Sequence, residues 1–391
     1  MRRPGYIFGF RKWRLDVIVS IRLCVACVKA FGLLRFAGEL KKYLGDNRNI
    51  FKDIPNRYVI HDKNIYAVPD LPPVNSSQFI QYLVNDIQAI NHNKKLPLLF
   101  AIVCISSSCP YSCYYCYNSS EHSQEQKISL PRLEYTIQGL IESGVKNIYL
   151  SGGEPMMRWD ALIHLLTKFQ NRNVRFWLIT TGWGIDKNEI KILKNLGLTG
   201  LMISLDSEDP NRIDLIKGKN AFQNSVDAIK SAVDGNLMVA IDCVMGKDLL
   251  MPDSFNNFVR FVGNLGASFI NCYTPKTIIN SNTNAVIHFN LEEYRHLAEL
   301  SERNLKGKNS VKMPLAYAPD IWEMKRGCMG GKLFIYISPD GNVKLCPFQK
   351  KVFGNIVHEN IEVILKVIGD VSNTEVCKTN ELLSESMKIQ G

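Results

Sequence analysis

An alternation of apolar and amphipathic segments between residues 98 and 272 limits the fold of this chain most strongly. Six short apolar runs have the length of buried strands, and stretches of helical periodicity separate them. This order is typical of stacked βα units around a parallel sheet. The expected strands are 98–104, 147–150, 174–179, 200–205, 237–244 and 268–272. The expected helices between and after them are 130–142, 161–170, 189–196, 222–233 and 254–265.

Three cysteines follow the first expected strand at short spacing. Cys109, Cys113 and Cys116 form the pattern C-x₃-C-x₂-C. Iron–sulfur clusters are normally held by four cysteine thiolates, so three thiolates leave one iron of a four-iron cluster without a protein ligand. In catalytic metal sites such an open position is where a substrate binds. A structural zinc knuckle is the alternative, with His122 as its nearby fourth ligand.

The second expected strand runs directly into Gly152, Gly153, Glu154 and Pro155. Adjacent glycines at a strand end allow the backbone to approach a ligand closely, and Pro155 fixes the exit of the chain. An ordinary strand-to-helix turn would explain the glycines but not the glutamate. Because ligands of parallel βα folds bind at the carboxyl ends of the strands, both motifs stand where a site is expected.

The two motifs together resemble the radical S-adenosylmethionine (radical SAM) superfamily, including an aromatic residue, Tyr115, directly before the third cysteine. The resemblance implies that Cys109, Cys113 and Cys116 hold a [4Fe-4S] cluster whose open iron binds SAM. It also implies that the Gly-Gly-Glu-Pro motif contacts the amino group of SAM, with Glu154 supplying the complementary charge. The implied fold is an α/β partial (β/α)6 TIM-like barrel, because a complete eight-stranded barrel takes about 250 residues.

Polar residues at later strand ends occupy positions that the family uses. Thr181 stands where relatives often have an asparagine, and Ser204 resembles a serine that contacts SAM. Asp206 ends the same strand. Lys217 precedes a glycine where many relatives have an Arg-Gly pair that binds the SAM carboxylate, although a lysine lacks the two-pronged geometry of arginine. The alternative for these residues is an ordinary role in a polar loop.

A second cysteine pattern lies near the C-terminus. Cys328 precedes two short strand patterns that are joined by a Pro-Asp-Gly turn, and Cys346 follows the second of them. This arrangement resembles the opening of the SPASM/twitch extension, which carries auxiliary iron–sulfur clusters. The resemblance implies one auxiliary [4Fe-4S] cluster on Cys328, Cys346 and Cys377, since two clusters would need more thiolates than remain. Buried cysteines without a cluster are the alternative.

The N-terminal stretch 13–44 is apolar with regularly placed charges. Its longest uncharged runs are far shorter than the about 20 residues of a membrane-spanning helix, and we find no secretory signal with a small-residue cleavage site. The pattern predicts one amphipathic helix, either lying on an anionic membrane surface or packed on the body of the protein. Cys24 and Cys27 within it are interpreted as packing residues.

The composition narrows the kinds of partner and the cellular compartment that we expect for this chain. The chain has 391 residues, is 46% hydrophobic and carries a net charge of +10 that is scattered rather than clustered, so nucleic acid is not an expected partner. Eleven cysteines, several of them crowded around one loop, favour cofactor binding in a reducing cytoplasm over a secreted disulfide scaffold. Cys104, Cys243 and Cys272 fall within expected strands and are predicted core residues.

The predicted organisation has five parts. They are an amphipathic helix (1–45), a linker with a hairpin and a helix (46–95), the radical SAM partial barrel (96–275), a connecting helical segment (276–325) and a SPASM/twitch-like auxiliary cluster region (326–391). The predicted location is cytoplasmic, with peripheral membrane contact through the N-terminal helix as an alternative.

The resemblance implies an enzyme that reductively cleaves SAM to a 5′-deoxyadenosyl radical, which abstracts a hydrogen atom from a substrate. A one-electron donor such as flavodoxin or ferredoxin is the implied partner. The substrate class stays open between a peptide in post-translational modification and a lipid or other small molecule. No catalytic triad or carboxylate pair is expected, because the cofactor carries the hard chemistry. A non-catalytic iron–sulfur electron carrier is a further alternative, but it would not need the Glu154 motif.

Overall fold

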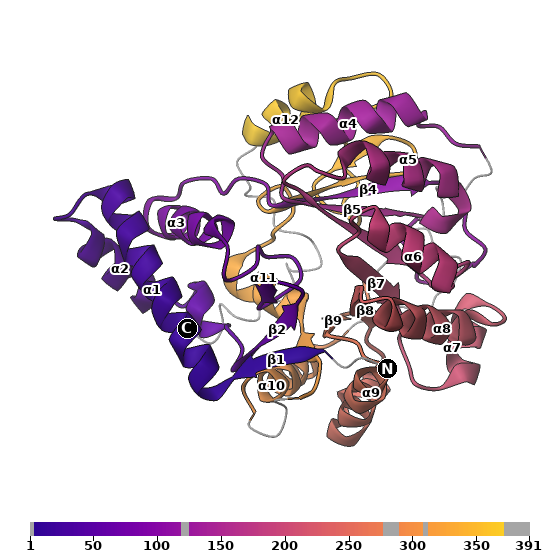
Figure 1. Ribbon diagram of the computed structural model, residues 1–391, viewed down its shortest axis with the longest axis horizontal. Coiled ribbons are helices and arrows are strands. Elements are labelled where there is room, and N and C mark those ends of the chain that lie inside the picture. The colour runs from indigo at the N-terminus through magenta and orange to yellow at the C-terminus, as the bar shows by residue number, and fades with distance from the viewer. Residues whose placement is uncertain (1–3, 119–124, 277–288, 308–311, 371–391) are drawn as a thin grey trace.

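A ten-stranded sheet organises the chain, whose computed structural model describes residues 4–118, 125–276, 289–307 and 312–370 (Figure 1). Six consecutive strands form its parallel centre. They are β4 (Phe100–Ser106), β5 (Asn147–Gly152), β6 (Arg175–Thr180), β7 (Gly200–Ser204), β8 (Met238–Val244) and β9 (Phe269–Tyr273). Each of the six predicted strands is confirmed to within two residues, because each apolar run forms one buried strand.

Helices follow these strands in the predicted order and cover one face of the sheet (Figure 1). They are α4 (Leu130–Glu142), α5 (Trp159–Phe169), α6 (Lys187–Asn195), α7 (Pro210–Lys217), α8 (Ala221–Asp234) and α9 (Pro252–Asn264). Their apolar stripes share one core with the alternate strand residues that point to the same side, such as Leu150 and Ile203. Short 3₁₀ turns, η3 (Pro155–Arg158) and η4 (Lys247–Leu250), precede α5 and α9. The predicted α/β fold with a mostly parallel sheet is confirmed.

The sheet extends beyond the six predicted strands on both sides. β10 (Leu315–Tyr317) adds in parallel to β9, between α10 (Leu291–Lys306) and α11 (Pro319–Arg326). On the other side, β11 (Phe334–Ile337) pairs in parallel with β4, and β12 (Asn342–Lys344) and β13 (Gly354–Asn355) continue antiparallel. The C-terminal helix α12 (Ile361–Asp370) packs on α4. The predicted C-terminal hairpin is therefore confirmed, and it lies beside the strand that precedes the cysteine loop.

The other face of the sheet is partly covered by an N-terminal antiparallel sheet of β1 (Gly5–Phe8), β2 (Arg57–His61) and β3 (Asn64–Tyr66). Val59 and Tyr66 from this small sheet are buried against Trp177 and other residues of the large one. Arg57 is fully buried, and its guanidinium donates to the carbonyl oxygens of Asn304 (2.7 Å) and Pro314 (3.0 Å). These contacts bind the hairpin to α10 and β10.

The N-terminal segment forms two helices where the sequence predicts one. α1 (Gly9–Phe31) and α2 (Phe36–Gly45) are separated by a bend of 118°. The prediction of a continuous helix is wrong because Gly32 takes a left-handed φ of 85° and ends α1. No single described helix is long and apolar enough to cross a membrane, although this bent pair reaches the required length and composition when taken together.

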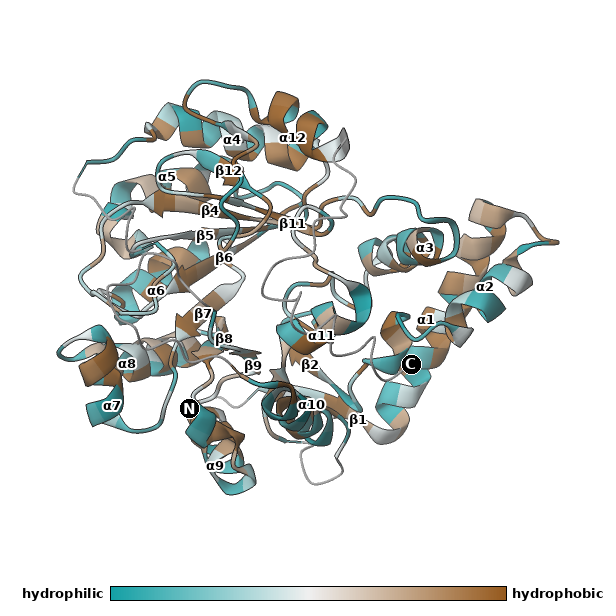
Figure 2. Ribbon diagram, turned by 180° about the vertical axis from the view of Figure 1, so that it is seen from behind, coloured by the Kyte–Doolittle hydropathy of each residue, from teal (hydrophilic) through white to brown (hydrophobic). Residues whose placement is uncertain are grey.

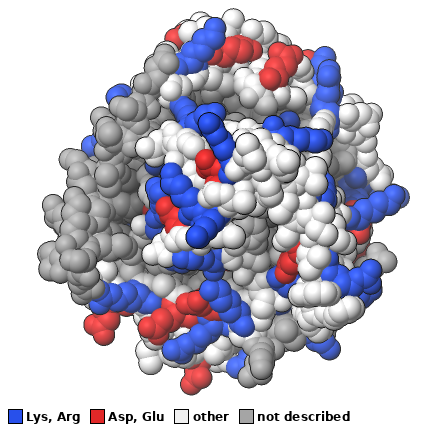
Figure 3. Space-filling view, turned by 90° about the vertical axis from the view of Figure 1, so that its left-hand side faces the viewer, with Lys and Arg blue, Asp and Glu red and all other residues white. Residues whose placement is uncertain are grey.

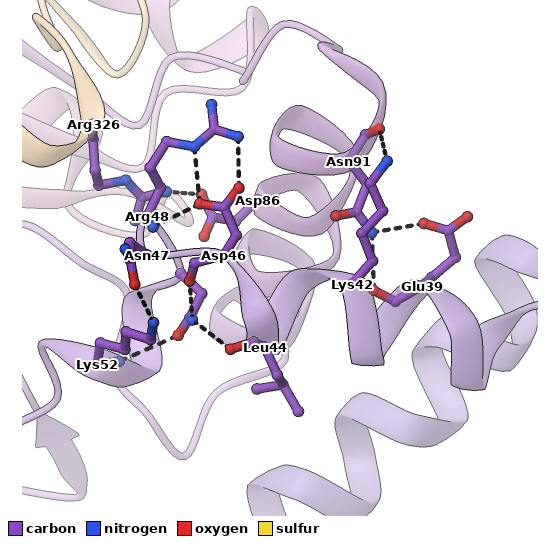
Figure 4. Close-up of polar contacts among 11 residues, drawn as sticks. Glu39, Lys42, Leu44, Asp46, Asn47, Arg48, Lys52, Asp86, Asn91 and Arg326 are labelled. Carbon is purple, nitrogen blue, oxygen red and sulfur yellow. Dashed lines mark hydrogen bonds and ion pairs between the residues drawn. The ribbon is translucent and has the colours of Figure 1, made fainter. Parts of the chain in front are cut away.

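Both N-terminal helices pack on α3 (Ser77–His92). The 3₁₀ turn η1 (Ile50–Lys52) follows α2 in the chain. Of the two alternatives for the N-terminal segment, packing on the body is the one that these contacts show. Figure 4 shows the polar part of this attachment, in which Lys42 Nζ donates to the carbonyl oxygen of Asn91 (2.7 Å) and Asn91 Nδ2 donates to Glu39 (2.7 Å). The buried Asp86 accepts a hydrogen bond from Tyr43 (2.6 Å). It also pairs with Arg326 of α11 (Figure 4).

Candidate active site

The cysteine loop lies at the carboxyl end of β4. Cys109, Cys113 and Cys116 are all half-buried, and Cys116 N donates to the carbonyl oxygen of Cys113 (3.1 Å). Burial is the main cause that raises the pKa of Cys109 to about 11 and that of Cys113 to about 12, and the neighbouring Cys116 contributes to both. The three thiols are therefore electrostatic neighbours in a partly desolvated position, where free thiolates are disfavoured.

These residues fit a [4Fe-4S] cluster. The thiolates of such a cluster bind different irons, so the sulfur atoms need to border a common volume rather than converge on one point. No group of three His, Cys, Asp or Glu side chains converges on a single-ion site among the described residues. A bound cluster would supply the positive charge that stabilises thiolates at a buried position. His122, the alternative zinc ligand, lies outside the described residues.

The two glycines of the second motif pack directly against the cysteine loop. A Cβ on Gly152 would collide with the carbonyl oxygen of Ser106, and one on Gly153 would collide with that of Ser108. The Cβ on Gly153 would also lie 3.0 Å from Cys109 Cβ. Gly153 N donates to Ser106 O (2.9 Å), and the next amide donates to Ser108 O (2.7 Å). Glycine is thus required here by close approach, and the two motifs are in contact.

Glu154 lies at the centre of this junction with no exposed surface. Its carboxylate accepts hydrogen bonds from Thr180 Oγ1 (2.7 Å), from Thr181 N (2.9 Å) and Thr181 Oγ1 (2.7 Å), and from Met156 N (3.1 Å). Burial raises the pKa of Glu154, and these hydrogen bonds oppose that rise. Pro155 follows directly and begins η3. The structure therefore joins the predicted residues Glu154 and Thr181, and it adds Thr180, which lacks a sequence signal of its own.

The remaining predicted residues form a second buried polar group beside the cysteine loop. Lys217 Nζ donates to Ser204 O and Ser204 Oγ (2.8 Å each) and lies 3.3 Å from Asp206 Oδ2. Tyr115 OH donates to the same carboxylate. The Lys217 ammonium also lowers the pKa of Cys113, against the effect of burial. All four predicted residues are thus brought together, and Lys217 is neutralised by Asp206 instead of standing as a free cation.

A polar row that sequence analysis missed continues this group along the sheet. Ser204 of β7, Asp242 of β8 and Asn271 of β9 are register partners, so their side chains share the face opposite the helices. Asn271 Nδ2 donates to Asp242 Oδ1 (2.8 Å). Burial is the main cause that raises the pKa of Asp242 to about 7, and the nearby carboxylates of Asp70 and Asp206 contribute to the rise. Polar residues at alternate positions near three successive strand ends are the signal that could have revealed this row.

The C-terminal cysteines Cys328 and Cys346 are half-buried on the hairpin side of β4. A Cβ on Gly330 would lie 3.4 Å from Cys346 Cβ, so the segment after Cys328 borders Cys346. Tyr117, which follows the cysteine loop, packs its ring against Phe348 with centroids 5.6 Å apart. The two cysteine regions are therefore linked through Tyr117, whereas Cys377 lies outside the described residues.

The predicted core cysteines are all buried, but they differ in their surroundings. Cys243 and Cys272 lie in the main core, as predicted. Cys104 points instead to the polar side, where its Sγ donates to Tyr336 OH (3.3 Å). In α1, Cys27 is buried as predicted, whereas the packing prediction for Cys24 is wrong because its side chain is exposed.

The pattern of the Radical SAM superfamily matches residues 103–261, which include the cysteine loop and the Gly-Gly-Glu-Pro motif. The chain carries a radical SAM domain and belongs to that superfamily. The family resemblance expected from the sequence motifs is confirmed.

Two kinds of curated radical SAM relative are similar in sequence. A GTP 3′,8-cyclase of Synechococcus elongatus is 28% identical over 163 residues, which cover 40% of this chain and 49% of the relative. A PqqA peptide cyclase of Bradyrhizobium diazoefficiens is 26% identical over 261 residues, which cover 64% of this chain and 67% of the relative. The matched part thus spans about half the length of the GTP cyclase and two thirds of the peptide cyclase.

Solved structures of the same superfamily share the fold. Streptococcus suis SuiB bound to S-adenosylmethionine superposes on 90% of this chain and 81% of its own, with a TM-score of 0.59 and 16% identity. The same protein bound to its precursor peptide SuiA gives a TM-score of 0.58. anSMEcpe with bound AdoMet covers 73% of this chain and 82% of its own, with a TM-score of 0.53 and 19% identity. This chain therefore shares the fold of these proteins.

Proposed function

We propose that this radical SAM enzyme reductively cleaves SAM and abstracts a hydrogen atom from a peptide substrate. The observation that carries the proposal is the packing of Gly153 on Cys109, because it puts the buried Glu154 beside the cysteine loop. When bound, the cluster and SAM supply a 5′-deoxyadenosyl radical after transfer of one electron. The protein's part is to bind, orient and shield these groups.

In this proposal the residues of the site have separate roles. Cys109, Cys113 and Cys116 hold the cluster, and the Glu154 carboxylate accepts a hydrogen bond from the amino group of SAM. Thr181 fixes the orientation of that carboxylate through two hydrogen bonds. Lys217 pairs with Asp206, which in turn accepts a hydrogen bond from Tyr115 of the cysteine loop. The Lys217 ammonium also favours the thiolate form of Cys113. The buried charges are each paired or hydrogen-bonded, as a preorganised site requires.

A peptide substrate is supported by the longer of the two sequence matches. The PqqA peptide cyclase match covers 64% of this chain, whereas the GTP 3′,8-cyclase match covers 40%. A match of the shorter length is accounted for by the SAM-binding domain, which relatives with different substrates share. The architecture of SuiB, which was solved with a precursor peptide, points in the same direction. A small-molecule substrate is the second candidate, since the GTP cyclases act on one.

We further propose that Cys328, Cys346 and Cys377 hold one auxiliary [4Fe-4S] cluster and that a flavodoxin or ferredoxin donates the electron. The contact of Tyr117 with Phe348 supports a short path between the two cysteine regions.

Anaerobic reconstitution with iron and sulfide tests the proposal. The wild-type protein should bind about four irons at the first site and about eight with the auxiliary site filled. With dithionite and SAM it should release 5′-deoxyadenosine, measured by liquid chromatography with mass spectrometry. Cys113→Ala should abolish this product, and Cys24→Ala, which changes an exposed cysteine of α1, should not. Retained cleavage in the Cys113→Ala protein would rule out the proposed loop, and zinc in place of iron would rule out the cluster.

A further inference from the structure

The two faces of α1 differ in what covers them. On the inner face Val19, Leu23 and Cys27 are buried with residues of α3 in one apolar cluster. The opposite face carries an apolar stripe at helical spacing that remains exposed to solvent. It consists of Phe10 (69% exposed), Trp13 (58%), Val17 (38%), Ile21 (60%) and Val25 (53%). Because residues three and four apart lie on one side of a helix, these five side chains form a continuous surface.

The exposed apolar surface continues past the end of α1. Leu33 and Leu34 in the bend before α2 are 71% and 98% exposed, and Leu44 near the end of α2 is 52% exposed. Figure 2 shows the brown, hydrophobic positions along both helices, which form the arm that projects from the body. Contiguous exposed apolar patches on a protein surface mark interaction sites.

Basic residues accompany the apolar stripe. Arg11, Arg14 and Lys29 of α1 are exposed, and Arg35 and Lys41 extend the positive charge to the bend and α2. Figure 3 looks onto this side of the molecule and shows Lys and Arg side chains bordering an uncharged patch.

Negative charge on α1 is confined to one carboxylate that is already engaged. Asp16 accepts from Lys12 Nζ (2.5 Å) and from Tyr58 OH (2.7 Å). The free charge on the outer side of α1 is therefore positive, which complements an anionic surface and does not match a neutral or basic one.

We propose that this apolar stripe, with Leu33 and Leu34, inserts into the headgroup region of a bilayer that contains anionic lipids. An exposed stripe of Phe, Trp and Ile with Arg and Lys at its edge is the pattern of helices that lie in the plane of a membrane surface. The inner face is occupied by α3, so α1 presents only its outer face to the lipid and stays attached to the body. This inference does not depend on the proposed reaction.

Vesicle flotation of the full chain tests the inference. The wild-type protein should float with phosphatidylcholine vesicles that contain phosphatidylglycerol and bind weakly to phosphatidylcholine alone. Trp13→Gln combined with Ile21→Gln should lower the partition constant roughly a hundredfold or more, because each buried side chain of this size contributes at least about tenfold. Arg11→Gln combined with Lys29→Gln should weaken binding to the anionic vesicles by roughly fivefold for each charge.

Leu215→Gln is the matched control, because Leu215 is 87% exposed on α7, away from the arm. It should float like the wild type, and circular dichroism should show that all variants are folded. Absence of flotation, or equal flotation of the stripe variant, would overturn the inference. So would a wild-type dimer in light scattering that Trp13→Gln with Ile21→Gln converts to a monomer, since a second copy would then cover the stripe.

Discussion

Two cysteine-bearing regions of this protein are built in different ways. The loop that carries Cys113 is held by parts of the chain far from it in sequence, since Gly153 touches its start and Tyr115 donates to Asp206. The C-terminal hairpin that leads to Cys346 folds around a turn of local contacts, and its first strand, β11, pairs with β4. Its turn is closed by hydrogen bonds from Gly341 N to Ser338 O (2.9 Å) and from Ser338 N to Asn342 O (3.0 Å).

The first cysteine loop lies beside a group of buried charged side chains. Glu154, Asp206 and Lys217 are buried beside the first cysteine loop, and each has protein partners. Buried charges cost free energy unless they are paired and hydrogen-bonded, so such a group stabilises a protein weakly by itself. Its presence beside the loop is better explained by function. The hairpin is formed by a turn and by strand pairing, which suits the accessory cluster that we propose for it.

The largest expected contrast comes from removing one cysteine in each region. Cys113→Ala should lower 5′-deoxyadenosine formation to background, whereas Cys346→Ala should keep it within about tenfold of the wild type. Each change should remove about four irons, because each disrupts one cluster. Product and iron assays on reconstituted protein check both values. An equal loss of SAM cleavage in the two variants would contradict the division into a reactive and an accessory region.

The buried ion pair beside the first loop should matter next. Lys217→Met leaves Asp206 uncompensated, and breaking a buried pair typically costs about 3–5 kcal/mol. We expect urea denaturation to show a loss of this size in the free energy of unfolding. Lys219→Met, two residues along at an exposed position, should change it by about 0.5 kcal/mol or less. Equal stability of the two variants would show that the loop does not depend on this pair.

Glu154→Gln separates SAM binding from loop stability. The change keeps the size of the side chain but removes its charge, so hydrogen bonds to the carboxylate weaken. Hydrogen bonds to charged groups contribute about 1.5–3 kcal/mol, so the Kd for SAM should rise roughly tenfold to a hundredfold. Calorimetry on the reconstituted protein measures this rise. Glu142→Gln, at an exposed end of α4, should leave the Kd unchanged, and an unchanged Kd for Glu154→Gln would remove Glu154 from the site.

Asp242 should give the protein a pH-dependent stability. Its carboxyl group has a pKa of about 7 in the folded state, mainly because of burial, against about 3.9 when unfolded. The folded state therefore binds more protons between about pH 4 and pH 7, and its stability falls as the pH rises through that range. The facing carboxylates of Asp70 and Asp206 add to this rise of the pKa, and Asn271 and Lys217 oppose it without cancelling it.

Asp242→Asn should consequently be more stable than the wild type at pH 8, on the order of 2 kcal/mol, with the difference shrinking toward pH 4. Urea denaturation at several pH values measures it. Asp227→Asn, on the exposed face of α8, should show no such trend. A wild type that gains stability between pH 4 and pH 7 relative to Asp242→Asn would contradict the assignment.

The contrast between the regions also explains how far sequence analysis reached. The six central strands and the hairpin turn were predictable because strand periodicity and turn residues act over a few neighbours. The single N-terminal helix was predicted wrongly, because its apolar periodicity runs across Gly32, whose left-handed backbone bends the chain by 118°. The addition of β11 to β4 was also not predictable, since strand order depends on contacts between residues more than 200 positions apart.

The sequence by itself determined the family, the mostly parallel sheet and the chemical identity of the donors on the cysteine loop. These depend on spacing and on side-chain type, which a sequence contains in full. Only the tertiary structure decided that Thr180 supports Glu154, that Lys217 is paired with Asp206, and that Asp242 and Asn271 continue the polar row. The physical reason is that burial and pairing set the charge behaviour of a side chain, and both depend on residues from other strands.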